Sequence, residues 1–305
     1  ANNTAVGIDA LKANTTGGAN TVVGRLAADA NTTGTFNTVM GNNALGANTT
    51  GDQNVAIGSG SLFYNTTASN NTAVGQNSLF SNTTGTGNVA IGRESLCDNT
   101  TGTGNTGLGA NALEKVITGS CNTGIGRNSL FKNTADNNTA VGYYSLICNT
   151  TAAQNTAVGA CALASTTTGG CNTGVGYLSL NTNTEGTSNV AVGRGTLQLN
   201  TTGASNVAVG RQALNNNTTG DGNTASGYYA LNDNTTADNN TASGYYALEK
   251  NTTGADNTAT GWCALGSNTT ASNNTSVGYQ AGCKITTGGE NTALGRKALE
   301  NLTTG

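Results

Sequence analysis

The chain has 305 residues, of which 9% are charged, and its formal net charge is −3. It contains 45 Gly, no Pro and no His. The chain is poor in the large apolar residues of an ordinary globular core, and it also lacks the high net charge and the Pro content that are usual in disordered chains. Without His there is no His-containing catalytic triad and no imidazole metal site, and we expect neither an enzyme nor a cofactor. Scattered Lys and Arg predict no nucleic-acid partner, and no apolar run is long enough for a membrane span.

A 17-residue motif, Asn-Thr-Ala-Val-Gly-x-x-Ala-Leu-x-x-Asn-Thr-Thr-Gly-x-x, repeats along the whole sequence. Positions are numbered below from its leading Asn, and each repeat is called a coil. The eighteen leading residues are Asn3, Asn20, Asn37, Asn54, Asn71, Asn88, Asn105, Asn122, Asn138, Asn155, Asn172, Asn189, Asn206, Asn223, Asn240, Asn257, Asn274 and Asn291. Only the step from Asn122 to Asn138 is 16 residues, because the Asn-Thr-Thr-Gly turn has lost one residue there.

Within each coil the elements follow one order. Positions 2 to 4 predict a short strand, in which Thr or Val at position 2 and Val or Ile at position 4 share one face and contribute to the core. Gly at position 5 predicts a corner where φ is positive or the backbone approaches closely. Leu at position 9 predicts a second apolar contact, and Asn-Thr-Thr-Gly predicts the next corner. The residues that represent these columns are Asn3, Asn20, Asn54, Gly7, Gly24, Gly58, Leu11, Leu45 and Leu62.

Stacked parallel coils explain this pattern better than hairpins. The sequence contains no Asn-Gly dipeptide, which is the strongest short-hairpin signal. Identical Asn residues in successive coils would instead form an amide ladder along in-register strands. We therefore predict an all-β fold, a parallel β-solenoid (β-roll) of eighteen 17-residue coils that spans residues 1–305 as a single uncapped array.

The two ends of the sequence fit one another in register. Placing Gly305 before Ala1 completes a 17-residue repeat, and neither end carries a polar cap of the kind that solenoids use. Two interpretations follow: subunits stack head to tail into a filament, or the chain is a window of a longer array.

The segments Asn54-Val55-Ala56-Ile57-Gly58 and Asn206-Val207-Ala208-Val209-Gly210 resemble the Ser-Val-Ala-Ile-Gly strand of trimeric autotransporter adhesin heads. Similar repeats occur in tail-fibre-like proteins of bacteriophages. The resemblance implies a left-handed β-roll, a homotrimer and a role in surface attachment. The present repeat is longer by one Asn-Thr-Thr-Gly corner, and the sequence shows no coiled-coil stalk heptads.

Aromatic residues gather at position 6 of four successive coils, where they are candidates for a glycan-binding platform. They are Tyr228, Tyr245, Trp262 and Tyr279. Stacked aromatic side chains in a solenoid also pack simply against one another, so both interpretations stand.

The Asn-Thr-Thr corners are formal N-glycosylation sequons. The first four are Asn14, Asn31, Asn48 and Asn65. The alternative is that these side chains make the turn by hydrogen bonds to the backbone. Ranks of Thr at positions 13 and 14 also raise the hypothesis of an ice-binding face.

The chain has seven Cys residues, and no two of them occupy the same repeat position in adjacent coils. We expect small hydrophobic fillers, with a Cys148–Cys161 disulfide as the alternative.

The leading functional prediction is a structural extracellular fibre or filament subunit built by stacking of solenoid coils, located outside the cell or on a cell or virion surface. Its expected partner is itself, head to tail and as a trimer. The alternative is an adhesin or tail-fibre shaft that binds surface glycans through the late aromatic columns, and the third hypothesis is an ice-binding solenoid.

Overall fold

A computed structural model describes residues 2–304 of the chain. Within these residues the secondary structure consists of short β-strands and turns, and no helix is present. The chain divides into two compact units, Ala1–Ala153 and Gln154–Gly305, which are described separately below as the first and the second unit.

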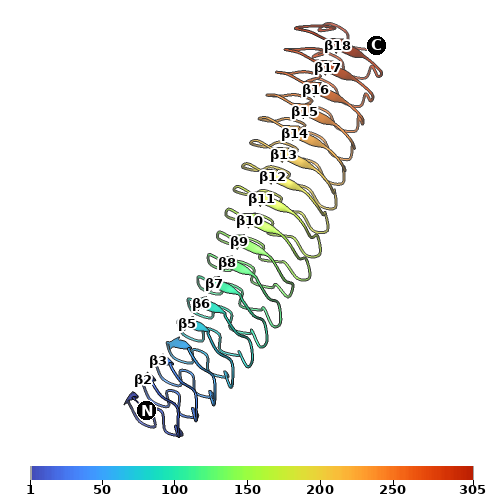
Figure 1. The fold of residues 1–305 in the computed structure, drawn as a ribbon. Helices are drawn as coiled ribbons and strands as arrows, with labels where there is room; N and C mark the ends of the chain where they lie inside the picture. The colour runs from blue at the N-terminus through green and yellow to red at the C-terminus, as the bar shows by residue number, and fades with distance from the viewer. Residues whose placement is uncertain (1, 305) are drawn as a thin grey trace. The chain divides into compact units, whose positions relative to one another are not determined.

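The first unit contains nine three-residue strands that pair in parallel and in chain order (Figure 1). They are β1 (Thr4–Val6), β2 (Thr21–Val23), β3 (Thr38–Met40), β4 (Val55–Ile57), β5 (Thr72–Val74), β6 (Val89–Ile91), β7 (Thr106–Leu108), β8 (Thr123–Ile125) and β9 (Thr139–Val141). Each strand occupies positions 2 to 4 of its coil, as the repeat predicts.

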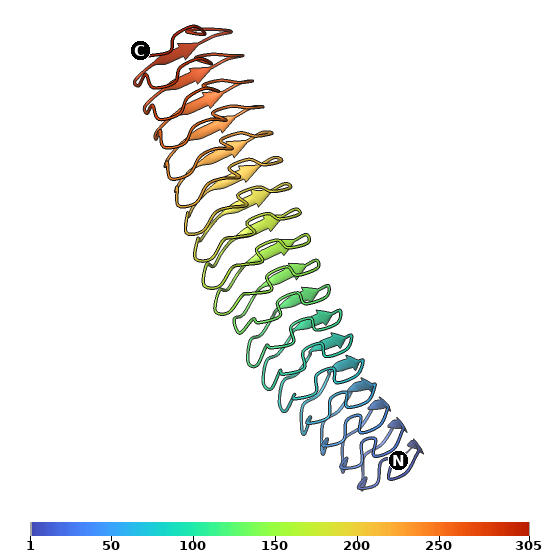
Figure 2. The same ribbon diagram turned by 180° about the vertical axis from the view of Figure 1, so that it is seen from behind.

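The second unit repeats the arrangement with nine further strands, again parallel and in chain order (Figure 2). They are β10 (Thr156–Val158), β11 (Thr173–Val175), β12 (Val190–Val192), β13 (Val207–Val209), β14 (Thr224–Ser226), β15 (Thr241–Ser243), β16 (Thr258–Thr260), β17 (Thr275–Val277) and β18 (Thr292–Leu294). The predicted fold class, a parallel β-solenoid with one strand in each coil of about 17 residues, is confirmed.

The pairing register reproduces the repeat. Thr4 pairs with Thr21 and Thr72 pairs with Val89, so like positions lie side by side. Thr123 pairs with Thr139 although the coil between them is one residue short. The missing residue is absorbed in the turn, and the strands keep their register because a slip would reverse every side chain.

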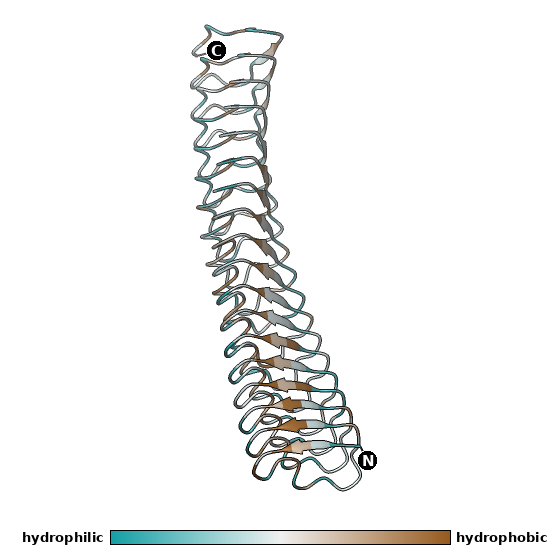
Figure 3. Cartoon of the chain, turned by 90° about the vertical axis from the view of Figure 1, so that its left-hand side faces the viewer, coloured by the Kyte–Doolittle hydropathy of each residue, from teal (hydrophilic) through white to brown (hydrophobic). Residues whose placement is uncertain are grey.

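The inward face of most strands carries the small residue of position 3 and not the residues of positions 2 and 4. Position 3 is buried, as at Ala56 and Ala73, whereas positions 2 and 4 point outward, as at Val190 and Val192. The prediction that position 4 contributes to the core is therefore wrong, although positions 2 and 4 do share a face. In Figure 3 several strand arrows near the N-terminal end of the first unit include brown, hydrophobic residues.

Leu at position 9 explains why the inward residue of the strand is small. Leu45 and Leu62 are fully buried, and Leu11 is nearly so. A Cβ added at Gly124, at position 3, would lie 3.0 Å from Cγ of Leu113 in the preceding coil. Where the preceding coil carries Leu at position 9, that side chain therefore limits the space for the strand residue.

Exceptions in the Leu column are compensated nearby. Ala28 replaces Leu in the second coil. At position 3, the strand of that coil carries Val22 and the strand of the next coil carries Val39, and Ala28, Val22 and Val39 are all buried. Gly282 replaces Leu in the seventeenth coil, where Ile285 is buried and its Cδ1 lies 3.1 Å from a Cβ added at Gly282. Neighbouring apolar side chains thus occupy space that the missing Leu would fill, as expected of a close-packed interior.

Gly at position 5 is required by both conformation and space. Gly24 and Gly58 have φ of 141° and 131°, a region that L-residues with side chains avoid. A Cβ at Gly7 would lie 2.4 Å from the carbonyl oxygen of Gly24, and one at Gly58 would lie 2.5 Å from that of Gly75. The predicted glycine corner is confirmed, and its cause is the direct contact between successive coils.

Two ladders of buried Asn side chains connect the coils. At position 1, the backbone N–H of Asn20 donates to Oδ1 of Asn3 at 2.9 Å, and Asn54 makes the same bond to Asn37. At position 12, Nδ2 of Asn65 donates to Oδ1 of Asn48 at 2.9 Å. The carbonyl oxygens at position 15 accept from both columns, so that Ala68 O receives Nδ2 of Asn54 and Asn65.

The second ladder has gaps where an apolar residue replaces Asn. Val116 and Ile285 are such replacements, and the Oδ1 atoms of Asn99 and Asn268 in the preceding coils are buried without a hydrogen-bond partner. A buried acceptor left unpaired costs about 1–3 kcal/mol, so these gaps are local weak points of the stack.

Replacing Gly58 by Ala should lower the free energy of unfolding by more than about 3 kcal/mol, because the new Cβ overlaps the Gly75 carbonyl and forces a disfavoured φ. Thermal and denaturant unfolding measure the change. Gly87→Asn is the matched control, since Gly87 has φ of 67° and open space around it. That control should change stability by less than about 0.5 kcal/mol. Equal effects of the two substitutions would contradict the role given to position 5.

Replacing Asn65 by Val should lower the free energy of local opening of coils 3 to 5 by about 2–4 kcal/mol. The substitution leaves Oδ1 of Asn48 without its donor and removes one of the two acceptors of Asn82 Nδ2, which keeps its bond to Gly85 O. Native-state hydrogen exchange of the backbone amides in these coils provides the measurement. Thr67→Val, at an exposed position of the same turn, should leave exchange unchanged within about 0.5 kcal/mol.

Candidate functional site

The aromatic column at position 6 of the second unit is the most distinctive surface of the described residues. Tyr228 and Tyr245 stack with ring centroids 5.0 Å apart and planes 9° apart. Trp262 and Tyr279 stack in the same way, at 5.0 Å and 12°. The ring spacing follows from the spacing of parallel strands, about 4.8 Å, because each ring stands at the same position of consecutive coils.

Arginine guanidinium groups cover the outer faces of this column. The guanidinium of Arg211 lies 5.6 Å from the ring centroid of Tyr228, and that of Arg296 lies 5.8 Å from the centroid of Tyr279. Both Arg residues also occupy position 6, in the coils directly before and after the four aromatic ones. Each contact is a cation–π interaction, which contributes about 0.5–1 kcal/mol at an exposed site.

The column presents ring edges and hydroxyl groups to solvent. Tyr245, Trp262 and Tyr279 are 45%, 40% and 44% exposed. One face of each ring is covered, by the ring with which it stacks, and the second faces of Tyr228 and Tyr279 are covered by guanidinium groups, whereas a sugar ring binds aromatic residues mainly through their faces. The observed geometry therefore supports packing between coils directly, and binding of surface glycans through these four residues stays a prediction.

The Tyr residues at position 7 reinforce the same column. Tyr246 contacts Tyr245 edge to face at 4.4 Å and Tyr228 at 5.7 Å. A hydrogen bond with Tyr245, together with partial burial, raises the pKa of the Tyr246 hydroxyl to about 12. This hydroxyl stays protonated at neutral pH, and its hydrogen bond joins the two Tyr residues.

The Asn-Thr-Thr corners lie with their Asn side chains turned inward. Asn31, Asn48 and Asn65 are buried, and the Nδ2 of each donates to a position-15 carbonyl of its own coil. Asn14 is partly exposed and makes the equivalent bond to Gly17 O. Since a glycan attaches to Nδ2, modification at the buried residues would have to precede folding. The turn-forming role of these side chains is present in the structure.

The Thr hydroxyls at position 13 also serve the backbone. Oγ1 of Thr32 donates to Thr49 O at 2.9 Å, and Oγ1 of Thr201 donates to Thr218 O at 3.0 Å. These hydroxyls are directed along the stack toward the next coil. An ice-binding face would depend on the exposed rank at position 14, and that hypothesis stays a prediction.

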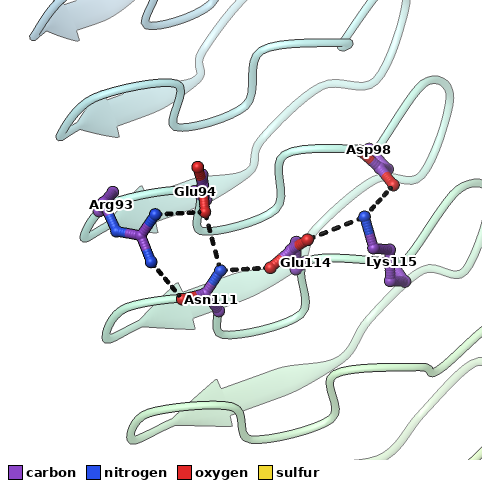
Figure 4. Close-up of polar contacts among 6 residues, drawn as sticks. All are labelled: Arg93, Glu94, Asp98, Asn111, Glu114 and Lys115. Carbon is purple, nitrogen blue, oxygen red and sulfur yellow. Dashed lines mark hydrogen bonds and ion pairs between the residues drawn. The ribbon is translucent and has the colours of Figure 1, made fainter.

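A polar network joins the sixth and seventh coils on the surface of the first unit (Figure 4). Arg93 pairs with Glu94 at 2.7 Å, Asn111 contacts Glu94 and Glu114, and Lys115 bridges Glu114 and Asp98. Hydrogen bonds to both carboxylates raise the pKa of Lys115. Exposed ion pairs of this kind contribute little stability, so the network is a surface feature of two adjacent coils.

All seven cysteines are free thiols, including Cys148 and Cys161 of the disulfide alternative. Burial, followed by the nearby carboxylates of Asp98 and Glu114, raises the pKa of Cys97 to about 11. Comparing Cys residues at the same repeat position does not reveal one close pair, Cys263 and Cys283, whose sulfur atoms lie 3.0 Å apart.

Within residues 2–304 the structure contains no pocket and no group of His, Cys, Asp or Glu residues that could hold a metal ion. The described part of the chain also has no helix with the length and apolar character needed to cross a membrane. Comparisons with protein-family models, with curated proteins and with solved structures find no match to this chain.

Replacing Tyr245 by Ala should lower the free energy of local opening of the fourteenth and fifteenth coils by about 1–2 kcal/mol, because it removes one stacked and one edge-to-face ring contact. Hydrogen exchange of the amides in these coils measures the loss. Tyr245→Phe keeps the ring and should retain most of the stability. A glycan array of the unmodified protein, repeated with the Ala variant, tests the binding hypothesis separately.

Proposed function

We propose that this chain is a structural subunit of an extracellular fibre, in which copies extend the β-solenoid by stacking coil upon coil. One observation carries the proposal: the interface between coils is nearly the same at every level within a unit. The position-2 N–H donates to the position-1 carbonyl of the next coil at 2.9 Å from Thr4, Thr21 and Thr38. A coil surface of this kind is complementary to the opposite surface of any other coil, including one of a second copy.

The Asn ladders support the same proposal through their direction. In the position-1 ladder each coil offers an Oδ1 acceptor to the following coil and a backbone donor to the preceding one. This polarity favours head-to-tail addition over head-to-head contact, because two like surfaces would oppose acceptor to acceptor. Repetition of one heterologous interface generates an open filament.

Lateral association is supported by the outer strip, which we define as the position-2 and position-4 side chains of the strands of one unit. In β12 and β13 this strip consists of Val190, Val192, Val207 and Val209, which are 36–43% exposed. A flat row of exposed β-branched residues is an unusual surface for a monomer and fits contact with a second copy. The trimer expected from the adhesin-like strand motifs would bury this strip, and the extracellular location is proposed from the same resemblance.

Electron microscopy of the purified full chain tests the stacking. We expect filaments that lengthen with protein concentration and a meridional fibre-diffraction spacing of about 4.8 Å. Particles of one fixed length at all concentrations would contradict head-to-tail assembly, whereas they would remain compatible with an adhesin shaft.

A double substitution in the outer strip tests the lateral contact. Val192→Lys with Val209→Lys places two charges on adjacent exposed strands, and it should reduce the sedimentation mass of the assembly toward that of a single column. Thr202→Lys with Thr219→Lys adds the same charge at exposed turn positions of the same two coils and should leave the mass unchanged. If both variants had the same sedimentation mass, the outer strip would not be part of the lateral interface.

A further inference from the structure

We propose that Cys263 and Cys283 form a redox-active pair that closes into a disulfide between the sixteenth and seventeenth coils. Their sulfur atoms lie 3.0 Å apart, and both side chains are partly exposed free thiols. A disulfide needs the two sulfurs at about 2.05 Å, so closure requires a movement of only about 1 Å. The inference does not depend on fibre assembly.

The fold brings these two residues together although they belong to different columns. Cys263 stands at position 7 of its coil and Cys283 at position 10 of the next, a separation of 20 residues. The same 20-residue relation recurs where Nδ2 of Asn181 donates to Cys161 O at 2.9 Å and where Nδ2 of Asn232 donates to Gln212 O at 2.9 Å. Position 10 of one coil therefore regularly lies against position 7 of the coil before it.

Among the seven cysteines, this pair alone has the required separation of 20 residues. Cys161 occupies position 7, but the residue in the facing position is Asn181. Cys97 occupies position 10, and the residue 20 positions before it is Asn77. The sequence thus places a second thiol at the correct site only once.

The oxidant would be a small-molecule disulfide such as oxidised glutathione. A thiolate of the pair attacks one sulfur of the small disulfide, and the first small thiol leaves with its electron pair and takes up a proton. The second protein thiolate then attacks the protein sulfur of the mixed disulfide and releases the second small thiol. The protein loses two protons and two electrons, and the small disulfide is reduced to two thiols.

Burial, then the hydrogen bond with Cys283 and the charge of Glu249, raises the pKa of Cys263 to about 12, and Lys250 opposes the shift. The Cys263 thiolate is therefore scarce at neutral pH, and the exchange is run at alkaline pH to increase its fraction. The bond would tie together two coils that otherwise meet through hydrogen bonds and packing. Local opening of these coils should slow by about 100-fold after oxidation, as judged from hydrogen exchange.

The experiment treats the full chain with oxidised glutathione, blocks remaining thiols by alkylation and maps the peptides by mass spectrometry. No Lys or Arg lies between Lys250 and Lys284, so both cysteines fall in one tryptic peptide. We expect that peptide to lose two hydrogens and to carry no alkyl group, and chymotryptic cleavage after Tyr279 should leave its parts linked. Cys97 should be alkylated or carry glutathione.

Two variants separate the pair from general thiol reactivity. Cys263→Ser should leave Cys283 alkylated or bound to glutathione, with no internal crosslink. Asn181→Cys should create a new crosslink to Cys161, because it reproduces the 20-residue relation in the tenth and eleventh coils. Alkylation of Cys263 and Cys283 to the same extent as Cys97, or crosslinks from either residue to another cysteine, would overturn the proposal.

Discussion

Close contact between successive coils is the constraint on which this structure depends. The glycine carbonyls at position 5 lie so near the preceding coil that a Cβ on Gly24 would meet the Gly41 oxygen at 2.3 Å. Backbone hydrogen bonds at about strand spacing demand this approach, and no side chain can be inserted into it. The repeat keeps Gly in this column because any other residue would separate the two coils that it joins.

The narrow core follows from the same spacing. Each level has room for one Leu, with a small residue opposite it on the strand, so apolar burial is limited at each coil. Buried Asn side chains occupy the rest of the interior and are almost all paired, through Oδ1 to the next coil and through Nδ2 to the position-15 carbonyls. A hydrogen-bonded interior of this type avoids the cost of unpaired polar groups and fixes the register of neighbouring coils.

The outside of the coils differs along the chain, and this variation carries the candidate functions. The strip on the strands is apolar in β12 and β13 but polar in β14 to β16, where Ser226, Ser243 and Thr260 occupy position 4. The aromatic column lies in these three coils and in the next one, with Arg211 and Arg296 at its two ends. A uniform interior therefore supports surfaces with different chemistry, since outward positions are not constrained by the core.

The sequence by itself determined the parallel stacking, the 17-residue period and the glycine corners, because each depends on residues that recur in one column. It also placed Tyr228 and Tyr245 in one column, where their rings stack. Only the tertiary structure decided which strand face points inward: a period of two residues defines two faces, and the width of the Leu column selects the small one. The contact between Cys263 and Cys283 could not be predicted from the columns of the repeat, because the two residues stand at different positions. It depends on the path of the backbone through positions 7 and 9, where residues such as Cys263 and Leu265 have positive φ. The repeat in the sequence specifies which like positions stack on one another. Contacts between different positions of neighbouring coils depend on the path of the folded backbone, which the repeat alone does not give.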